Sequence, residues 1–145
     1  MLFIIIAAIL IISIRGFKNI SFFNKYKFNI RSINNGDKYR MFTSGFLHVD
    51  YNHLFFNLFT LFVFSTSILN QLGEIYYLAI YIASLYFGNY YTLKHYKNQN
   101  FYSAVGASGA VSGIVYSSIL LFPEMKLVFI FFPIPLPSYI FGVVY

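Results

Sequence analysis

The sequence predicts an all-α fold, a bundle of helices that crosses a membrane several times. Three observations predict it. The chain of 145 residues is 59% hydrophobic and only 10% charged, whereas about a quarter of an ordinary soluble domain is charged. Four long apolar stretches contain no charged residue at all: 53–73, 75–93, 98–123 and 127–145. The links between them are short, so consecutive helices are expected to lie side by side as antiparallel neighbours.

A fifth apolar stretch, residues 1–14, is shorter than the roughly 20 residues that span the hydrocarbon layer. It has no basic segment in front of it, and Ser13-Ile14-Arg15 is a poor cleavage site for a signal peptide. We therefore expect a first membrane helix, which can continue past Arg15 to Ile20 if the arginine side chain reaches back to the interface. The sequence thus predicts about five membrane helices in a single domain, residues 1–145.

The segment between residues 15 and 45 is polar but mixes Phe and Ile with Lys and Asn, as an amphipathic segment at a membrane surface does. Asn35-Gly36-Asp37 predicts a turn within it. Its basic side chains flank membrane helices, so contact with anionic lipid head groups is expected, and nucleic-acid binding is not. These residues are Arg15, Lys18, Lys25, Lys27, Arg31, Lys38 and Arg40.

The stretch 45–57, "GFLHVDYNHLFFN", places polar side chains where an apolar helix begins. His53 and Asn57 are four residues apart and so share one face of that helix. His48 precedes the helix near the membrane surface. One interpretation is that His48 anchors the interface and that Asn57 bonds to a neighbouring helix. Another is a metal site, for which Asp50 would have to supply the third ligand.

A second polar motif, "SAVGASGAVSG" at 103–113, is expected to begin the helix of the stretch 98–123. The spacing of Gly109 and Gly113 lets two helices approach closely, and packing alone explains most of this motif. It does not explain Ser108, which lies between Gly106 and Gly109 where helical N–H groups lack partners. These are the conditions for a nucleophile beside an oxyanion-binding backbone. The chain has no cysteine, which excludes thiolate catalysis and cysteine-based metal sites.

Taken together, the two motifs resemble those of the rhomboid family of intramembrane serine proteases. The resemblance rests on Arg40 before the first motif, on the spacing His-x4-His-x3-Asn, and on Gly-x-Ser-Gly at 106–109. It covers nearly the whole chain, from the first predicted helix, at 1–14, into the fifth, at 127–145. The resemblance implies a rhomboid-like bundle of six helices, of which about five are present here.

The resemblance also implies a role for each site residue. Ser108 would be the nucleophile that attacks a peptide carbonyl, and Gly106 would shape the backbone of its motif. His53 and Asn57 would donate to the oxyanion together with the Ser108 N–H, while His48 would shape a water-accessible mouth. No metal or organic cofactor is implied. The expected substrates are single-pass membrane proteins, cleaved within the lipid bilayer, where a helix must open before its carbonyl can be attacked.

In rhomboids the general base is a histidine on the sixth helix, and the sequence contains only His48, His53 and His95. His95 lies in the link before the serine helix, where the family has no base. The chain stops within an apolar run, so we expect a sequence truncated before the sixth helix and inactive by itself. The alternative is a non-catalytic rhomboid-like protein that binds membrane clients. A transporter or channel is disfavoured, since no charged residue lies in the middle of an apolar stretch.

The expected orientation is less simple. Nine of the ten basic residues lie in the first and third links, which the positive-inside tendency would place in the cytoplasm, with the N-terminus outside. Bacterial rhomboids of this minimal kind keep the N-terminus in the cytoplasm and open the site outward. Because the first link of the family is partly embedded, we follow the resemblance and expect a multi-pass protein of a bacterial cytoplasmic membrane.

Overall fold

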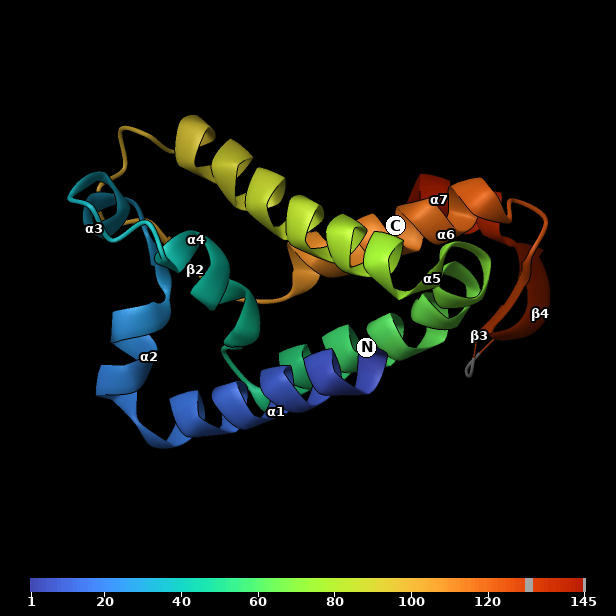
Figure 1. Ribbon diagram of the computed structural model, residues 1–145, viewed down its shortest axis with the longest axis horizontal. Helices are drawn as coiled ribbons and strands as arrows, with labels where there is room; N and C mark the ends of the chain where they lie inside the picture. The colour runs from blue at the N-terminus through green and yellow to red at the C-terminus, as the bar shows by residue number, and fades with distance from the viewer. Residues whose placement is uncertain (130–131, 145) are drawn as a thin grey trace.

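The structure is a computed structural model that describes residues 1–129 and 132–144. Helices dominate it, and there are two small antiparallel sheets, of which one, β1–β2, joins distant segments and the other, β3–β4, is a hairpin (Figure 1). In chain order the elements are α1 (Leu2–Lys18), α2 (Ile20–Tyr26), β1 (Phe28–Asn29), α3 (Ile30–Asn34), α4 (Arg40–Thr43), the 3-10 turn η1 (Ser44–Phe46), α5 (Tyr51–His95), β2 (Ser103–Ala104), α6 (Ser108–Leu121), β3 (Lys126–Phe129), β4 (Phe132–Pro137) and α7 (Ser138–Val144).

Helix α1 contains the first apolar stretch and continues past Arg15 to Lys18, as expected. Leu2, Ile5 and Ile9 lie three and four residues apart and are buried in the main core, because this spacing puts them on one face of the helix. At the other end the Arg15 guanidinium lies 4.5 Å from the centre of the Phe22 ring in α2. The charge of Arg15 therefore does not interrupt the helix.

Helix α5 consists of two arms that meet at Gly73, where φ is 82° and ψ is 176°. This conformation suits glycine and breaks the helical path. Figure 1 shows the chain reversing there, between the green arm and the yellow-green one. The arms, residues 51–72 and 74–95, correspond to the predicted stretches 53–73 and 75–93. Each is about 33 Å long at 1.5 Å per residue, close to the thickness of the hydrocarbon layer.

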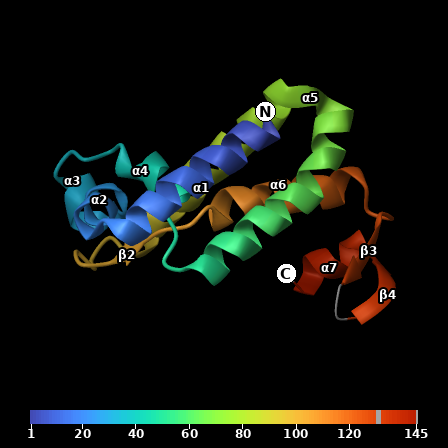
Figure 2. The same ribbon diagram turned by 90° about the horizontal axis from the view of Figure 1, so that it is seen from below.

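Helix α6 packs chiefly against α5 and lies in the middle of the molecule (Figure 2). Glycines make the close approach possible. A Cβ added to Gly88 of α5 would lie 3.7 Å from the Cα of Gly109, and one added to Gly113 would collide with Ser84 of α5. Residues 103–107 of the motif precede the helix, and Ser108 lies at its start, as expected. Gly106, with φ of 131°, cannot continue a right-handed helix.

The polar segment 15–45 folds into short elements that cover one end of the bundle, with a small apolar core of its own. The predicted turn is present, and Gly36 has φ of 113° there. Arg40 is buried, and its guanidinium donates to the carbonyl oxygens of Asn24 and Lys27 and to Asp37 Oδ2. One side chain therefore ties together three parts of this segment.

The predicted membrane helix at 127–145 is wrong for the residues that the structure describes. Strands β3 and β4 form an antiparallel hairpin in which Leu127 faces Leu136, and only the short α7 follows. The sequence FPIPLP at 132–137 explains the difference. A proline at every second position removes alternate N–H donors and disfavours the helical conformation of the residue before it, so no helix can form.

Among the described residues, α5 is the one helix long and apolar enough to cross a membrane by length and composition, and α6 is a shorter apolar helix of 14 residues. The described residues therefore do not contain the five separate spanning helices that were predicted. The all-helical expectation holds for the bundle and fails at the two small sheets.

Candidate functional site

The backbone before Ser108 is held in place by the polar segment that covers it. Strand β2 pairs with β1, with Phe28 opposite Ala104 and Asn29 opposite Ser103. Further along, the Gly106 N–H donates to the Ser44 carbonyl oxygen at 3.0 Å. These bonds position the loop 103–107, so that α6 begins beside the end of α5 that carries His53.

Gly106 brings His53 and Ser108 together. A Cβ added to this glycine would lie 2.7 Å from His53 Cε1, 2.9 Å from His53 Nε2 and 3.7 Å from Ser108 Oγ. The imidazole and the hydroxyl therefore border the same small space beside the glycine backbone. Glycine is required at position 106 for two reasons. Its φ of 131° disfavours any other residue, and a Cβ atom would collide with the His53 imidazole.

Ser108 is exposed and is the first residue of α6. Its backbone N–H therefore belongs to the first helical turn, whose N–H groups have no carbonyl partner within the helix. These N–H groups and the positive end of the helix dipole favour negative charge at this point. The predicted nucleophile thus lies where the charge of an oxyanion would be stabilised.

His48 is fully buried and connects three elements. Its Nε2 accepts a hydrogen bond from the Ala107 N–H at 3.3 Å, and its Nδ1 lies 2.9 Å from Ser13 Oγ on α1. The Ser13 hydroxyl in turn donates to the Phe46 carbonyl oxygen at 2.8 Å. The His48 and His53 rings are in edge-on contact, with centroids 4.8 Å apart.

The pKa of His48 is lowered to about 4, chiefly because burial disfavours the imidazolium and secondly because His53 stands beside it; the Asp50 carboxylate opposes this effect. The expectation that His48 shapes a water-accessible mouth differs from the structure, because none of its surface is exposed. The physical reason is that both ring nitrogens have partners inside the protein. His48 instead supports the loop 103–107 through the Ala107 N–H.

Asn57 lies one turn deeper along α5 than His53 and is nearly buried. Its Nδ2 donates to the His53 carbonyl oxygen at 2.9 Å, across one helical turn. A carboxamide has two N–H donors, so one of them remains after this bond. The i, i+4 spacing read from the sequence is present in the structure, with His53 nearer the serine.

A cavity of about 360 Å³ lies beside Ser108, between the second arm of α5, the loop 103–107 and η1. Its wall includes polar groups that the sequence reasoning missed, among them Ser44, Asn89 and Thr92. Asn89 Nδ2 donates to the Met41 carbonyl oxygen at 2.7 Å and lies 3.2 Å from Ser44 Oγ. The cavity gives water-sized molecules space next to the serine hydroxyl.

Asp50 and His95, the two remaining candidates, have structural contacts away from Ser108. Asp50, considered above as a metal ligand, caps α5 by accepting the His53 N–H at 2.7 Å. Among the described residues, no group of three His, Cys, Asp or Glu side chains could hold a metal ion. His95 ends α5 and stacks on Tyr91, with ring centroids 5.7 Å apart.

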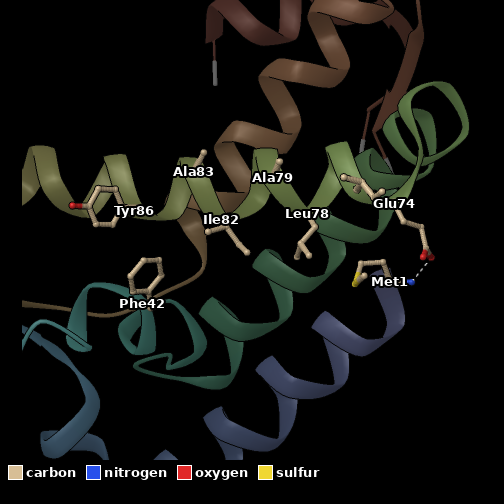
Figure 3. A pocket seen from close by; sticks show the side chains of 9 residues that line it. Met1, Phe42, Glu74, Leu78, Ala79, Ile82, Ala83 and Tyr86 are labelled. Atoms are coloured by element: carbon tan, nitrogen blue, oxygen red, sulfur yellow. Dashed lines mark hydrogen bonds and ion pairs between the residues drawn. The ribbon is translucent and has the colours of Figure 1, made fainter.

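A larger groove, of about 640 Å³, lies between the start of α1, α4 and the second arm of α5 (Figure 3). Apolar side chains line most of it, including Phe42 and Tyr86, whose rings stack at 5.5 Å. Its carboxylate, Glu74, pairs with the amino group of Met1 at 2.6 Å. This groove contains none of the predicted catalytic residues, so we place the candidate site at Ser108.

Ser13 is the other residue of this site that the sequence reasoning missed. It is the one polar side chain in the apolar stretch 1–14, and it is fully buried. A hydroxyl in such surroundings must find a partner, because leaving it unpaired costs free energy. That isolation was the available signal, but the sequence does not say that the partner is His48.

Comparison with known proteins agrees with the two motifs. The family model described as the Rhomboid domain matches residues 35–145. "RHOMBOID-like protein 12, mitochondrial" of Arabidopsis thaliana is 30% identical over 83% of this chain and 40% of its own length. "Putative rhomboid protease YdcA" of Bacillus subtilis is 36% identical over 61% of this chain and 44% of its own.

A yeast relative, "Rhomboid protein 1, mitochondrial" of Saccharomyces cerevisiae, is 32% identical over 63% of this chain and 28% of its own length. The chain thus spans less than half the length of each of these curated relatives. They come from mitochondria of eukaryotes and from a bacterium, and the similarity does not distinguish between these origins.

Proposed function

The chain belongs to the rhomboid family of integral membrane proteins, and we propose that it carries the nucleophile and the oxyanion site of an intramembrane serine endopeptidase. The observation that supports this most is the arrangement around Gly106. The Ser108 hydroxyl and the His53 imidazole border one small space, beside backbone N–H groups at the start of α6.

In the proposed reaction Ser108 Oγ attacks the carbonyl carbon of a peptide bond, and the carbonyl oxygen becomes an oxyanion. His53, the free N–H of Asn57 and the Ser108 backbone N–H would donate to that oxygen. Preorganised donors of this kind are each worth about 3 kcal/mol in the transition state. When this intermediate collapses, the C–N bond breaks and the amine fragment leaves with the proton that a general base took from the serine. Water from the cavity beside Ser108 would then hydrolyse the acyl-enzyme, which releases the acid fragment and restores the serine hydroxyl.

Attack requires a base that accepts the serine proton. His48 is unsuited to this, because its Nε2 already accepts the Ala107 N–H. His95 stacks in an aromatic cluster at the end of α5. By the family resemblance we propose that the base is a histidine of the full-length protein outside the printed sequence.

The proposed substrates are single-pass membrane proteins whose helices open readily at the cleavage point. A carbonyl inside an intact helix is already hydrogen-bonded and shielded, so small residues that destabilise the helix favour attack. We propose a bacterial cytoplasmic membrane as the location and expect no metal or organic cofactor.

The first prediction concerns the nucleophile. Ser108→Ala in the full-length protein should abolish cleavage of tagged single-pass substrates with Gly or Ala at their cleavage point, since no hydroxyl remains to attack. The assay is reconstitution in liposomes with gel detection of products. Ser117→Ala, on the same helix but outside the site, is the matched control and should cleave normally. Equal cleavage by the Ser108 and Ser117 variants would refute the nucleophile.

A second function deserves the same assay, because none of the three histidines here is placed as a base. A non-catalytic family member would bind membrane clients without cutting them. Under that function the wild-type protein captures the tagged substrates intact, and Ser108→Ala binds them no differently. Product formation by the wild-type protein decides against it.

A further inference from the structure

We propose that Ser13 on α1 is a positioning residue for the reaction centre, acting through His48 on the backbone that leads into Ser108. The inference rests on the proposed function for its catalytic consequence. Its structural part, the protonation of one imidazole, can be measured without any cleavage.

The directions of the hydrogen bonds follow from their donors. The Ala107 N–H can only donate, so His48 Nε2 must carry a lone pair. The proton of a neutral ring then resides on Nδ1, which donates to Ser13 Oγ. Ser13 uses its own proton for the Phe46 carbonyl oxygen. A continuous series of hydrogen bonds therefore runs from the Ala107 N–H through His48 and Ser13 to the Phe46 carbonyl oxygen.

This series of hydrogen bonds requires the His48 imidazole to be neutral. The ring has no exposed surface, and its titratable neighbours are His53 of α5 and Asp50 at the cap of that helix. The groups that face it from α1 and from the start of α6 are the Ser13 hydroxyl and the Ala107 N–H, neither of which titrates in this range. Protonation of Nε2 would turn the acceptor into a donor that opposes the Ala107 N–H.

These hydrogen bonds affect the position of Ser108 because Ala107 directly precedes it. Ala107 lies between Gly106, whose backbone adopts a left-handed φ, and Ser108, which begins α6. The Gly106 N–H is held by Ser44 and the Ala107 N–H by His48, so the two peptide units that lead into Ala107 are fixed. Losing the second anchor would leave the buried Ala107 N–H without its acceptor and let the Gly106–Ala107 peptide turn, which would shift the start of α6 and with it Ser108.

A role in packing alone makes a different prediction. If Ser13 and His48 merely filled space, the tautomer of His48 would be irrelevant, and removing the serine Oγ would change stability only. The fixed tautomer is therefore the property to measure.

The experiment uses the full-length protein labelled with 15N-histidine in detergent micelles, with each ring of this region assigned by a His→Gln variant. Long-range proton–nitrogen spectra distinguish the two neutral tautomers and the imidazolium. The wild-type His48 should show Nδ1–H and remain neutral until the pH falls to about 4. Ser13→Ala should shift the ring away from this tautomer, while Ser13→Thr, which keeps a hydroxyl, should preserve it.

The same variants are then assayed for cleavage. Ser13→Ala should lower kcat by about 10- to 100-fold with little change in KM, since misplacing a reacting group by about 1 Å can cost up to about 100-fold. Ser13→Thr should restore most of the rate. Ser65→Ala is the matched control, because it removes another buried serine hydroxyl, one bonded to Tyr77 of the other α5 arm. It should leave kcat and the His48 tautomer unchanged.

The outcomes separate the two proposals. An Nε2–H tautomer or an imidazolium at neutral pH in the wild-type protein would refute the inference, whatever the activity. A Ser13→Ala variant with normal tautomer and normal kcat would also refute it. A wild-type protein that shows the Nδ1–H tautomer but cleaves nothing would refute the proposed function, and the positioning role with it.

Discussion

At the level of single residues, Gly106 matters most for the candidate site. Its backbone conformation turns the chain into α6, and its missing side chain admits the His53 ring. Any side chain here would have to displace the imidazole or strain the backbone, and both would move Ser108. The motif Gly-x-Ser-Gly therefore has a local physical reason that is independent of the chemistry of the serine.

Gly106→Ala should remove cleavage almost completely and lower the free energy of unfolding by about 1–2 kcal/mol, because alanine pays a penalty at positive φ. Cleavage and denaturant unfolding of the same preparation measure both effects. Gly36→Ala is the matched control, since Gly36 also has a positive φ but has open space around its Cβ position. It should lose similar stability and keep its activity. Full activity of Gly106→Ala would contradict the placement of His53 against this glycine.

At the level of helices, the close approach of α5 and α6 determines where Ser108 lies. Small residues on both helices form the contact, with Ser84 and Gly88 on one and Gly109 and Gly113 on the other. A second tie is the hydrogen bond between Ser67 of α5 and Ser118 of α6, at 2.6 Å. Helices pack this closely within membranes when small residues line the interface.

Gly113→Ala should push the two helices apart and lower the free energy of unfolding in detergent by about 1–3 kcal/mol, the usual cost of overpacking. The added Cβ would overlap the Ser84 side chain near its base, where it cannot swing away. Gly88→Ala is the control: its nearest neighbour would be the Gly109 Cα at 3.7 Å, an ordinary contact. Equal stability of the two variants would show that the helices do not meet in this way.

At the level of the whole molecule, the polar segment 15–45 packs over one end of the bundle and holds the backbone of the site in place. It supplies β1, which pairs with β2 before Ser108, and Ser44, whose carbonyl oxygen accepts the Gly106 N–H. Arg40 fixes the segment by its bonds to Asn24, Lys27 and Asp37. The site thus depends on residues that are distant from Ser108 in the sequence.

Arg40→Ala should loosen this segment, because two carbonyl oxygens and a carboxylate lose their donor, at a cost of about 1–3 kcal/mol. We expect faster hydrogen exchange across 24–44 and a fall in cleavage, as the loop before Ser108 loses support. Hydrogen exchange by mass spectrometry in micelles measures the first effect. Arg31→Ala, which removes an exposed arginine of the same segment, should exchange like the wild-type protein. Unchanged exchange in the Arg40 variant would rule out its role as the tie.

Much of the helical bundle could be predicted from the sequence. Apolar stretches without charge mark α1, both arms of α5 and the inner part of α6, because only a helix satisfies its own backbone in such surroundings. The helix predicted at 127–145 is wrong because the alternating prolines at 133, 135 and 137 prevent a helix, although the stretch is apolar.

The spacing of His53 and Asn57 predicts that they share one helical face, and the glycines around Ser108 single out this serine. Both are local properties of the chain and can be read from the sequence. It could not place His53 against Gly106, bury His48 or pair it with Ser13. Those relations join residues 35 to 59 positions apart. They depend on how α1, α5 and α6 pack, and burial, which sets the protonation of His48, exists only after that packing.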